Sequence, residues 1–493
     1  MKILKFMVIF ICLLWNMVIL FLPASKVSAE KDIKNAIDNY VETFLKEHRI
    51  PGASIAIVHE NDLFYSKAWG VTGETEEKVT AETPFTIGSI SKSLTGLAIM
   101  KLIEEGTVNL EDPVKKYIPW FTLKDKEATS KITIKHLLTH SSGISTYSGL
   151  AISDKESDGL NAIKDNVESL SNVALTALPG EKHQYSDANF LILGSLIEEV
   201  TNQTYSDYMK QEIFLPLGMK NAAADHDTAY KKGYLAGYQS WFGIPRKSSV
   251  TYDNGGTPYG YITASAEDMV QYIKFLSRQE NDNFLTENTM NLYVSPHIQT
   301  GENRFYSLGL RITNPDSEEK MIWHSGSTPD SHAEMFFIPK TGWGGVILTN
   351  KNHILEEEAL FYLKQGIINI INGDEPVDIP SNTPSNTPIV QLITIGVICL
   401  LFLMLVYLLV KMRSKKVRKR SIWYIYGIIF LVLSIAIIPG LTYITDSPWH
   451  AIYVFSPDLA YLSIGVVILF ALNGLFSIMI AYKQNLQVKY ISS

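Results

Sequence analysis

The sequence has very little cysteine. Its two cysteines among 493 residues, Cys12 and Cys399, both lie inside apolar runs, and the region between them has none. A disulfide framework needs paired cysteines, and a thiolate metal site or a cysteine nucleophile needs at least one. The sequence therefore excludes all three between Cys12 and Cys399.

Positive charge is also scarce over most of the chain. The net charge is −7, yet seven of the ten residues from Lys411 to Arg420 are basic and further lysines lie near both ends. Residues 30–388 are therefore more acidic than the net charge suggests. Because an acidic surface repels polyanions, we expect no nucleic-acid partner. With 46% hydrophobic residues, the chain has enough apolar surface to fold rather than remain disordered.

The N-terminus has the pattern of an export signal. Lys2 and Lys5 precede an apolar run from Phe6 to Leu22, and small residues follow at Val27-Ser28-Ala29. A basic start, an apolar stretch and a small-residue cleavage site are typical of a secretory signal peptide. The alternative is an uncleaved membrane anchor, and either one exports the residues that follow.

Three long apolar runs lie near the other end, at Ile389–Val410, Ile422–Tyr443 and Leu459–Ala481. At 1.5 Å per helical residue, each is long enough to cross a hydrocarbon core of about 30 Å. Buried helices of a soluble domain are the alternative, which we disfavour because the runs are apolar on every side. The basic residues 411–420 separate the first two runs, and the positive-inside rule places them in the cytoplasm. Residues before Ile389 are then outside the cell.

These signals divide the chain into five parts. We expect a signal peptide at 1–29, an extracellular domain at 30–375, a linker at 376–388 containing SNTPSNTP, three transmembrane helices within 389–482 with the cytoplasmic loop 411–420, and a cytoplasmic tail at 483–493. The expected location is the cell membrane of a bacterium, with membrane lipid in contact with the three helices. A cysteine-free exported domain suits a Gram-positive bacterium.

The extracellular domain mixes helical and strand patterns. Apolar spacing predicts helices at about 32–48, 89–105, 188–201, 265–277 and 355–371. Strands are predicted in SIAIVHENDLFYSKAWG and in RFYSLGLRI, KMIWHS, AEMFFIP and GGVILTN. This order predicts an α+β fold, in which N- and C-terminal segments share one antiparallel sheet flanked by helices.

The pattern Ser-x-x-Lys occurs three times, at Ser28–Lys31, Ser89–Lys92 and Ser317–Lys320. The first spans the expected cleavage site and the third lies in a charged turn, but the second opens a helix. There Ser89 and Lys92 share one helix face, and the helix dipole favours negative charge on the serine. A lysine in an apolar site has a lowered pKa and accepts the serine proton. The plain alternative is a serine that caps the helix and a lysine in solvent.

Six segments in order resemble the signature blocks of one superfamily: FTIGSISKSLTG, IKHLLTHSSGI, PGEKHQYSDANFLILGSLIEEVT, IFLPLGM, YGYITASAEDMVQYI and WHSGSTPD. They resemble the serine β-lactamases and penicillin-binding proteins, in particular the class C-like branch that includes D-alanyl-D-alanine carboxypeptidases, D-peptidases and esterases. The resemblance covers about residues 50–350. It implies a β-lactamase/transpeptidase-like fold with a helical subdomain.

The resemblance also implies roles for individual residues. Ser89 would form an acyl-enzyme, Lys92 would accept its proton, and Tyr185 would shuttle protons. The backbone N–H groups of Ser89 and Ser327 would form the oxyanion hole. The Lys-Thr-Gly strand of the family corresponds to His324-Ser325-Gly326, so the resemblance places Asp187, His324, Gly326 and Ser327 among the expected substrate-binding and oxyanion residues.

The sequence departs from the family pattern at two positions. Asp187 stands where the family has asparagine, and a carboxylate beside Lys92 raises the pKa of that lysine. Either Tyr185 then carries more of the proton transfer, or a substrate donor neutralises Asp187; a weakly active or purely binding domain is the third outcome. His324 replaces the second cation, and its charge is conditional near neutral pH. We therefore expect weak activity on carboxylate-bearing substrates. His140 is expected to make a structural hydrogen bond.

The function implied is that of a membrane-anchored serine hydrolase acting on a cell-wall peptide or D-amino-acyl compound. A prodrug-activating D-peptidase and a teichoic-acid esterase are alternatives within the superfamily. From another class, the domain could bind a β-lactam or wall fragment as a sensor, but the expected cytoplasmic segments are too short for a signalling domain. We expect neither cofactor nor metal, because the histidines show no paired-ligand spacing.

Overall fold

The computed structural model describes residues 30–159, 161–277, 284–379, 387–413 and 420–491. The predicted signal peptide 1–29 lies outside the described residues, as do 380–386 of the linker and 414–419 of the basic loop. The described chain forms two compact units: a smaller one from residues up to 49 and 358–382, and a larger one from 50–357 and 383–493.

The smaller unit consists of a helix at residues 30–47 and most of α13 (Glu357–Asn372). The Tyr40 hydroxyl donates a hydrogen bond of 3.1 Å to the carbonyl of Tyr362. A Cβ at Gly366 would lie 2.2 Å from the Tyr40 ring, so only glycine lets the ring approach the helix this closely. Both helices were predicted from the apolar spacing.

The larger unit contains an eight-stranded sheet, in which every pairing is antiparallel. Its strands, in spatial order, are β2 (Asp62–Gly70), β1 (Gly52–His59), β12 (Trp343–Thr349), β11 (Ser331–Ile338), β10 (Met321–Thr328), β9 (Arg311–Thr313), β8 (Arg304–Tyr306) and β7 (Ile298–Gly301). The early strand β1 pairs with the late strand β12, Ala53 opposite Thr349. The predicted sharing of one sheet by N- and C-terminal segments is confirmed.

Two small sheets complete the strands. One contains β13 (Lys351–Asn352), β4 (Tyr238–Trp241) and β5 (Ile244–Lys247), and the other pairs β3 (Phe85–Thr86) with β6 (Thr263–Ala264).

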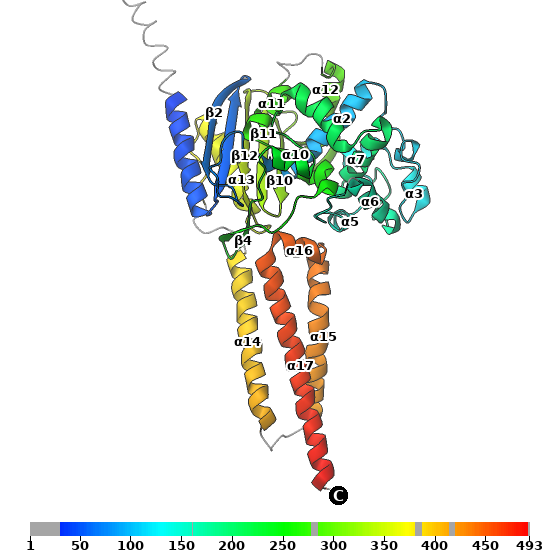
Figure 1. Cartoon of the computed structure of the whole chain (residues 1–493), viewed down its shortest axis with the longest axis vertical. Helices are drawn as coiled ribbons and strands as arrows, with labels where there is room; N and C mark the ends of the chain where they lie inside the picture. Colours follow the sequence, from blue (N-terminus) through cyan, green and yellow to red (C-terminus); the bar gives the residue numbers. More distant parts are fainter. Residues whose placement is uncertain (1–29, 160, 278–283, 380–386, 414–419, 492–493) are drawn as a thin grey trace, which may run out of the picture. The chain divides into compact units, whose positions relative to one another are not determined.

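Helices between β2 and β7 gather beside the large sheet (Figure 1). They are η1 (Gly88–Ile90), α2 (Ser91–Glu104), η2 (Val114–Lys116), α3 (Lys126–Ser130), α4 (Ile134–Leu138), α5 (Thr146–Leu150), α6 (Ala162–Glu168), η3 (Ser169–Asn172), α7 (Asp187–Thr201), α8 (Tyr205–Tyr208), η4 (Met209–Phe214), α9 (Leu215–Leu217), α10 (His226–Lys231), η5 (Asn254–Gly256), η6 (Thr257–Tyr261), α11 (Ala266–Leu276) and α12 (Glu287–Tyr293).

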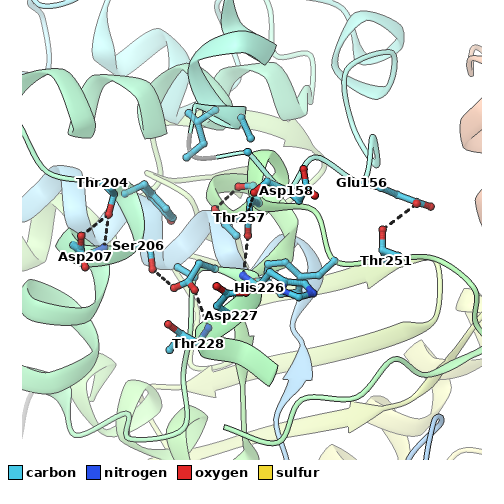
Figure 2. A pocket seen from close by; sticks show the side chains of 18 of the residues that line it. Glu156, Asp158, Thr204, Ser206, Asp207, His226, Asp227, Thr228, Thr251 and Thr257 are labelled. Atoms are coloured by element: carbon cyan, nitrogen blue, oxygen red, sulfur yellow. Dashed lines mark hydrogen bonds and ion pairs between the residues drawn. The ribbon is translucent and has the colours of Figure 1, made fainter. Parts of the chain in front are cut away.

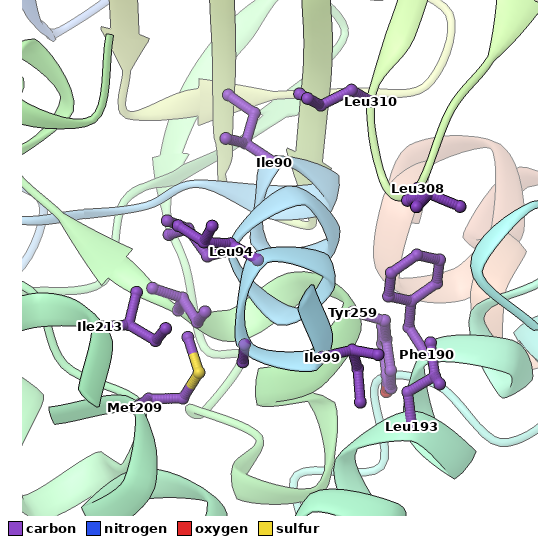
Figure 3. Packing of buried hydrophobic residues seen from close by; sticks show 14 of the residues in the cluster. Ile90, Leu94, Ile99, Phe190, Leu193, Met209, Ile213, Tyr259, Leu308 and Leu310 are labelled. Carbon is purple, nitrogen blue, oxygen red and sulfur yellow. The ribbon is translucent and has the colours of Figure 1, made fainter. Parts of the chain in front are cut away.

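Helix α2 lies at the centre of the core. Leu94 and Ile99 are fully buried and lie among apolar side chains from α7, η4, η6 and the β8–β9 loop (Figure 3). A Cβ at Gly96 would lie 2.2 Å from the carbonyl oxygen of Leu308, so glycine allows that loop to pack on the helix backbone. Burial on all sides fixes α2, and with it the residues at its start.

Three C-terminal helices are long and apolar enough to cross a membrane, over Ile389–Arg413, Ser421–Ile444 and Pro457–Lys483. They belong to α14 (Thr387–Arg413), α15 (Arg420–Ile444) and α17 (Pro457–Ile491), which run side by side in Figure 1. The sequence did not predict the short helix α16 (Trp449–Phe455) before α17.

Helices α15 and α17 approach closely at two glycines. A Cβ at Gly427 would lie 3.0 Å from the carbonyl oxygen of Gly474, and the reverse distance is also 3.0 Å. Small residues at such a crossing favour helix packing within a membrane.

Candidate active site

Ser89 and Lys92 lie together at the start of α2. Ser89 is in the short helix η1, and α2 begins after Ile90 without a side-chain cap. Lys92 is fully buried, and its Nζ lies 2.9 Å from Ser89 Oγ. The alternative of a capping serine with a solvated lysine is therefore wrong.

The Lys92 ammonium has three acceptors. Besides Ser89 Oγ, it donates to the carbonyl of Tyr259 at 2.8 Å and pairs with Asp187 Oδ1 at 2.7 Å. Burial, the largest single influence, lowers the pKa of Lys92, but attraction to Asp187, with a smaller contribution from Tyr185, outweighs it and the pKa is raised. The expected lowering by an apolar site is wrong. The raised pKa expected from Asp187 is confirmed.

His140 positions the segment that carries Tyr185 and Asp187. Its Nδ1 accepts hydrogen bonds from the Ser186 backbone N–H at 3.1 Å and from Asn189 Nδ2 at 3.0 Å, and its ring lies 4.2 Å from the Tyr185 ring. Burial, with nearby positive charge, holds the pKa of His140 well below its ordinary value, so the ring is neutral. The structural role expected for His140 agrees with these contacts.

Tyr185 lies directly beside the charged groups. Its ring centroid is 4.9 Å from Lys92 Nζ and 5.3 Å from the Arg311 guanidinium. Its hydroxyl is buried and contributes to the raised pKa of Lys92. It therefore lies close enough to the ammonium to interact with it.

Two glycines allow β10 to pack against the turn that carries Ser89. A Cβ at Gly88, whose φ is +53°, would lie 2.2 Å from the Ser327 backbone nitrogen, and a Cβ at Gly326 would lie 2.0 Å from the carbonyl oxygen of Ile87. The backbone at Ser89 and the backbone at Ser327 therefore lie side by side. This is the arrangement that an oxyanion hole built from their N–H groups requires.

His324 lies at the predicted position, but its ring is engaged by the protein. Its Nδ1 lies 2.6 Å from the carbonyl of Ser325 and its Nε2 lies 3.2 Å from the hydroxyl of Tyr306, and the residue is 1% exposed. With Nδ1–H donating and Nε2 accepting, a neutral imidazole satisfies both contacts. The ring has no nitrogen left to bind a substrate carboxylate.

Arg311 supplies the positive charge that the sequence analysis assigned to His324. It lines the same cavity as Ser89, and its guanidinium lies 5.3 Å from the Tyr185 ring and 5.5 Å from the Trp323 ring. An arginine remains charged at every physiological pH. The expectation that the pocket loses its cation near neutral pH is therefore wrong. Nothing in a lone arginine within a short strand distinguished it in the sequence.

A second hydrogen-bonded series begins at Ser327. Its Oγ lies 3.0 Å from His332 Nδ1, and His332 Nε2 lies 3.0 Å from Glu334 Oε1. Both His332 and Glu334 are buried, and they lie two residues apart on one face of β11. This series was not predicted from the sequence, although the spacing His-x-Glu shortly after Ser325-Gly326-Ser327 was a signal for it.

These residues open into a cavity of about 700 Å³. Its described lining residues are Ser89, Leu150, Tyr185, Asp187, Arg311, His324, Ser325, Gly326, Ser327, Ile354, Leu355, Glu357, Val390, Thr394, Leu441, Thr445, Ser447, Ala451, Ile452, Phe455, Ser456, Leu459 and Ser463. All of them belong to the larger unit. The structure thus brings Ser89, Tyr185, Asp187, His324, Gly326 and Ser327 to one cavity, with Lys92 buried behind Ser89.

Another cavity, of about 720 Å³, shares none of these residues. Its carboxylates are largely engaged with neighbours: Asp207 with the Thr204 hydroxyl at 2.8 Å, Asp225 with Ser206, and Glu156 with the Thr251 hydroxyl at 2.9 Å (Figure 2). Within the part of the chain that the structure describes, no group of three or more His, Cys, Asp or Glu residues is placed to hold a metal ion.

Comparisons with known proteins place these features in a family. A family model described as Beta-lactamase matches residues 37–365. "Protein flp" of Staphylococcus aureus (strain MRSA252) is 30% identical over 411 residues, covering 82% of this chain and 81% of the relative. "Penicillin-binding protein 4*" of Bacillus subtilis (strain 168) is 26% identical over 357 residues, covering 69% and 76%.

The fold is similar to that of solved structures. The octameric penicillin-binding protein homologue from Pyrococcus abyssi superposes with a TM-score of 0.62 at 27% identity, covering 70% of this chain and 78% of that one. The match is consistent with the α+β fold and antiparallel sheet described above.

Proposed function

Because the chain belongs to the beta-lactamase family of serine hydrolases, we propose that it is a membrane-bound hydrolase that cleaves an amide or ester through an acyl-enzyme on Ser89. The observation that carries the proposal is the buried Lys92, whose Nζ lies 2.9 Å from the Oγ of Ser89, a residue that lines a cavity of about 700 Å³. A nucleophile held by a buried amine in a pocket is the arrangement that covalent catalysis uses.

Acylation begins with attack of Ser89 Oγ on the substrate carbonyl carbon. The backbone N–H groups of Ser89 and Ser327 stabilise the oxyanion that forms. When the C–N or C–O bond breaks, Tyr185 delivers a proton to the leaving nitrogen or oxygen, and the acyl group remains as an ester of Ser89. A water molecule then attacks that ester, the acid leaves, and Ser89 regains its proton.

The proton of Ser89 needs an acceptor, and Lys92 is charged in the resting site. A substrate ammonium or amide N–H that binds Asp187 weakens the attraction between this carboxylate and Lys92, and so lowers the lysine pKa. Asp187 is 16% exposed and lines the cavity, so a substrate reaches it. Substrate binding would thereby prepare Lys92 as the base. Transfer to Tyr185 is the alternative route.

The proposed substrate class is a cell-wall peptide or another D-amino-acyl amide or ester. Asp187 suits an ammonium or amide donor, and Arg311 suits a carboxylate or carbonyl oxygen, which it binds with a planar pair of donors. A teichoic-acid D-amino-acyl ester and a D-peptide prodrug both fit this description. The pocket therefore favours substrates that present a donor and an acceptor on either side of the scissile bond.

Hydrolysis by the full-length protein in membranes tests the proposal. Ser89→Ala and Lys92→Ala are expected to reduce hydrolysis of an activated ester, and labelling by a fluorophosphonate, by several orders of magnitude. Ser317→Ala alters the exposed Ser-x-x-Lys copy and is the matched control, expected to keep both. Full turnover in Ser89→Ala, or loss of labelling in Ser317→Ala, would contradict the site.

We also propose that this domain faces outward, with residues 1–29 as signal peptide, 376–388 as linker, 411–420 as cytoplasmic loop and 483–493 as cytoplasmic tail. In a background with Cys12 and Cys399 replaced by serine, Asp446→Cys is expected to react with an impermeant thiol reagent in whole cells. Ser414→Cys is expected to react after lysis alone. Labelling of Ser414→Cys in intact cells would reverse the orientation.

A further inference from the structure

The cavity at Ser89 extends among the C-terminal helices. Eleven of its lining residues come from α14, the end of α15, α16 and the start of α17 or their connections: Val390, Thr394, Leu441, Thr445, Ser447, Ala451, Ile452, Phe455, Ser456, Leu459 and Ser463. Three of these four helices, α14, α15 and α17, contain the candidate membrane spans, and α16 directly precedes α17. A helix that served as an anchor alone would have no need to form the wall of a catalytic cavity.

The two ends of the cavity differ in chemistry. The charged lining residues are Asp187, Arg311 and Glu357, all from the part of the chain that carries Ser89, whereas the eleven helix residues are apolar or hydroxyl-bearing. A ligand that matched both ends would have a polar scissile group and an uncharged apolar extension. Ligand sites of this size are commonly apolar with a few placed polar groups.

Specific hydrogen bonds hold the helices against this part of the chain. The buried Asp458, at the start of α17, accepts from the Phe242 backbone N–H at 2.9 Å, lies 3.0 Å from His353 Nε2, and accepts from Gln391 Nε2 at 2.7 Å. A buried carboxylate with three partners is costly to separate from them. The junction at α17 and α14 is therefore fixed.

Short helix α16 is held in the same way. The Ile354 backbone N–H donates to the carbonyl of Phe455 at 3.0 Å, Gln239 Nε2 donates to the carbonyl of Val454 at 2.7 Å, and His450 Nε2 lies 2.9 Å from the carbonyl of Ser153. These contacts present Ala451, Ile452 and Phe455 to the cavity. The apolar wall is thus built into the structure at its junction with the membrane helices.

We propose that the substrate is an amphiphile whose alkyl chain occupies the helix-lined end of the cavity while its D-amino-acyl amide or ester lies at Ser89. This inference rests on the proposed function and narrows the class of substrate to amphiphiles. The chain enters from the membrane at the ends of α14, α15 and α17, where the lining residues lie. The spans then act as part of the binding site as well as an anchor.

Chain-length dependence of ester hydrolysis tests this inference. The full-length protein in lipid nanodiscs is given p-nitrophenyl esters of two, four, six and eight carbons. Each methylene moved from water into an apolar site favours binding roughly fourfold, so kcat/KM is expected to rise at least tenfold from the two-carbon to the eight-carbon ester. A flat series in the wild type would overturn the inference, with hydrolysis of the two-carbon ester still supporting the proposed function.

Paired variants separate the cavity from partition into lipid. Thr445→Trp places a large side chain in the cavity from an exposed position, and Ile444→Trp alters the adjacent residue, which is 79% exposed and does not line the cavity. Thr445→Trp is expected to abolish the rise with chain length, whereas Ile444→Trp is expected to keep both this rise and the turnover of the two-carbon ester. An equal rise in both variants would contradict the inference.

A second pair of variants controls for a folding defect. Ile452→Ala removes apolar contact from the cavity wall, and Val454→Ala removes a side chain of the same helix that does not line it. The eight-carbon advantage is expected to fall at least threefold in Ile452→Ala and to stay unchanged in Val454→Ala. Equal advantages in this pair would count against the inference.

A binding measurement tests the cavity without catalysis. Ser89→Ala protein in nanodiscs is irradiated with N-octanoyl-D-alanine methylamide that carries a diazirine at the chain end. Cross-links are expected on residues 441–463 and are expected to be lost in Thr445→Trp. Cross-links spread evenly over the lipid-facing helices would overturn the inference, even if no ester were hydrolysed.

Discussion

The ammonium of Lys92 lies 2.7 Å from Asp187 Oδ1 and 2.9 Å from Ser89 Oγ, so one buried cation joins a carboxylate to the proposed nucleophile. The carboxylate keeps the lysine charged, whereas a lysine that accepts the serine proton must be neutral. We therefore propose that the activity of the resting site depends on how strongly Asp187 holds Lys92.

Asp187→Asn is expected to move the acid limb of kcat/KM to lower pH. The raised pKa of Lys92 means that the base is protonated, and activity falls, as pH drops below that pKa. Without the carboxylate, burial remains and lowers the lysine pKa, so hydrolysis of a neutral ester at pH 7 increases. The pH profile measures this, with Asp207→Asn, in the other cavity, as control. If the acid limb of kcat/KM did not move, a group other than Lys92 would accept the proton of Ser89.

His332→Ala is expected to lower kcat roughly tenfold with little change in KM. The ring of His332 holds the Ser327 hydroxyl at 3.0 Å, and its loss lets the Ser327 backbone shift, a smaller effect than the ~10²–10³ of losing an oxyanion-hole donor. His332→Asn keeps a polar group near the Nδ1 position and should restore most of kcat. The kcat and KM of both variants are measured by steady-state kinetics. Equal losses of kcat in the two variants would contradict the proposal that His332 positions the Ser327 backbone.

Gly326→Ala is expected to destroy activity and to lower the free energy of unfolding by roughly 1–3 kcal/mol or more. Its Cβ would lie 2.0 Å from the carbonyl oxygen of Ile87 and 2.8 Å from the Ser89 backbone nitrogen, which forces β10 away from the nucleophile. Gly260→Ala is the matched control, because no atom lies within 4 Å of its added Cβ. Thermal unfolding and ester hydrolysis are measured on both. A fully active Gly326→Ala protein would show that the close approach is unnecessary.

The carboxyl of Asp154 is expected to make stability depend on pH. Burial raises its pKa to about 7, opposed by the Tyr261 hydroxyl that donates to it at 2.6 Å. The pKa of this carboxyl in the folded protein exceeds its value of about 3.9 in the unfolded chain. Its favourable contribution to the free energy of unfolding is therefore complete below about pH 4 and is lost as the pH rises to about 7. The loss is on the order of 4 kcal/mol at most. Asp154→Asn removes this loss.

Unfolding of Asp154→Asn is therefore compared with wild type at pH 5 and pH 8. Asparagine tolerates the left-handed backbone at this position, where φ is +55°, and still accepts from Tyr261. The variant is expected to gain more stability at pH 8 than at pH 5, whereas the exposed control Asp158→Asn should show no such difference. The same gain at both pH values would contradict a raised pKa at Asp154.

Much of the fold followed from local patterns. Two strand-like runs around a polar turn marked β1 and β2, and helical spacing marked α7 and α11 to within one residue of their observed ends. Residues Ser89, Tyr185, Asp187 and His324 were identified because they lie within recognisable motifs. Local spacing and motif order were sufficient for these features.

Other features depended on tertiary contacts that no local pattern encodes. Arg311 becomes part of the site because β9 lies beside β10, and His332 because β11 pairs with β10. Asp187 was expected to raise the pKa of Lys92, but the extent of the burial that opposes it, and the 2.7 Å distance that lets Asp187 outweigh that burial, came from the structure. Likewise, apolar composition predicted three spans but gave no sign that their ends line the cavity at Ser89.

Peptide mapping of a trapped acyl-enzyme is the most direct test of the central claim that Ser89 is the nucleophile. The full-length protein is treated with an activated ester or a penicillin, quenched in acid and analysed by mass spectrometry. A covalent adduct is expected on Ser89 in the wild type, and none in Ser89→Ala. An adduct on another serine, or one that persists in Ser89→Ala, would contradict it.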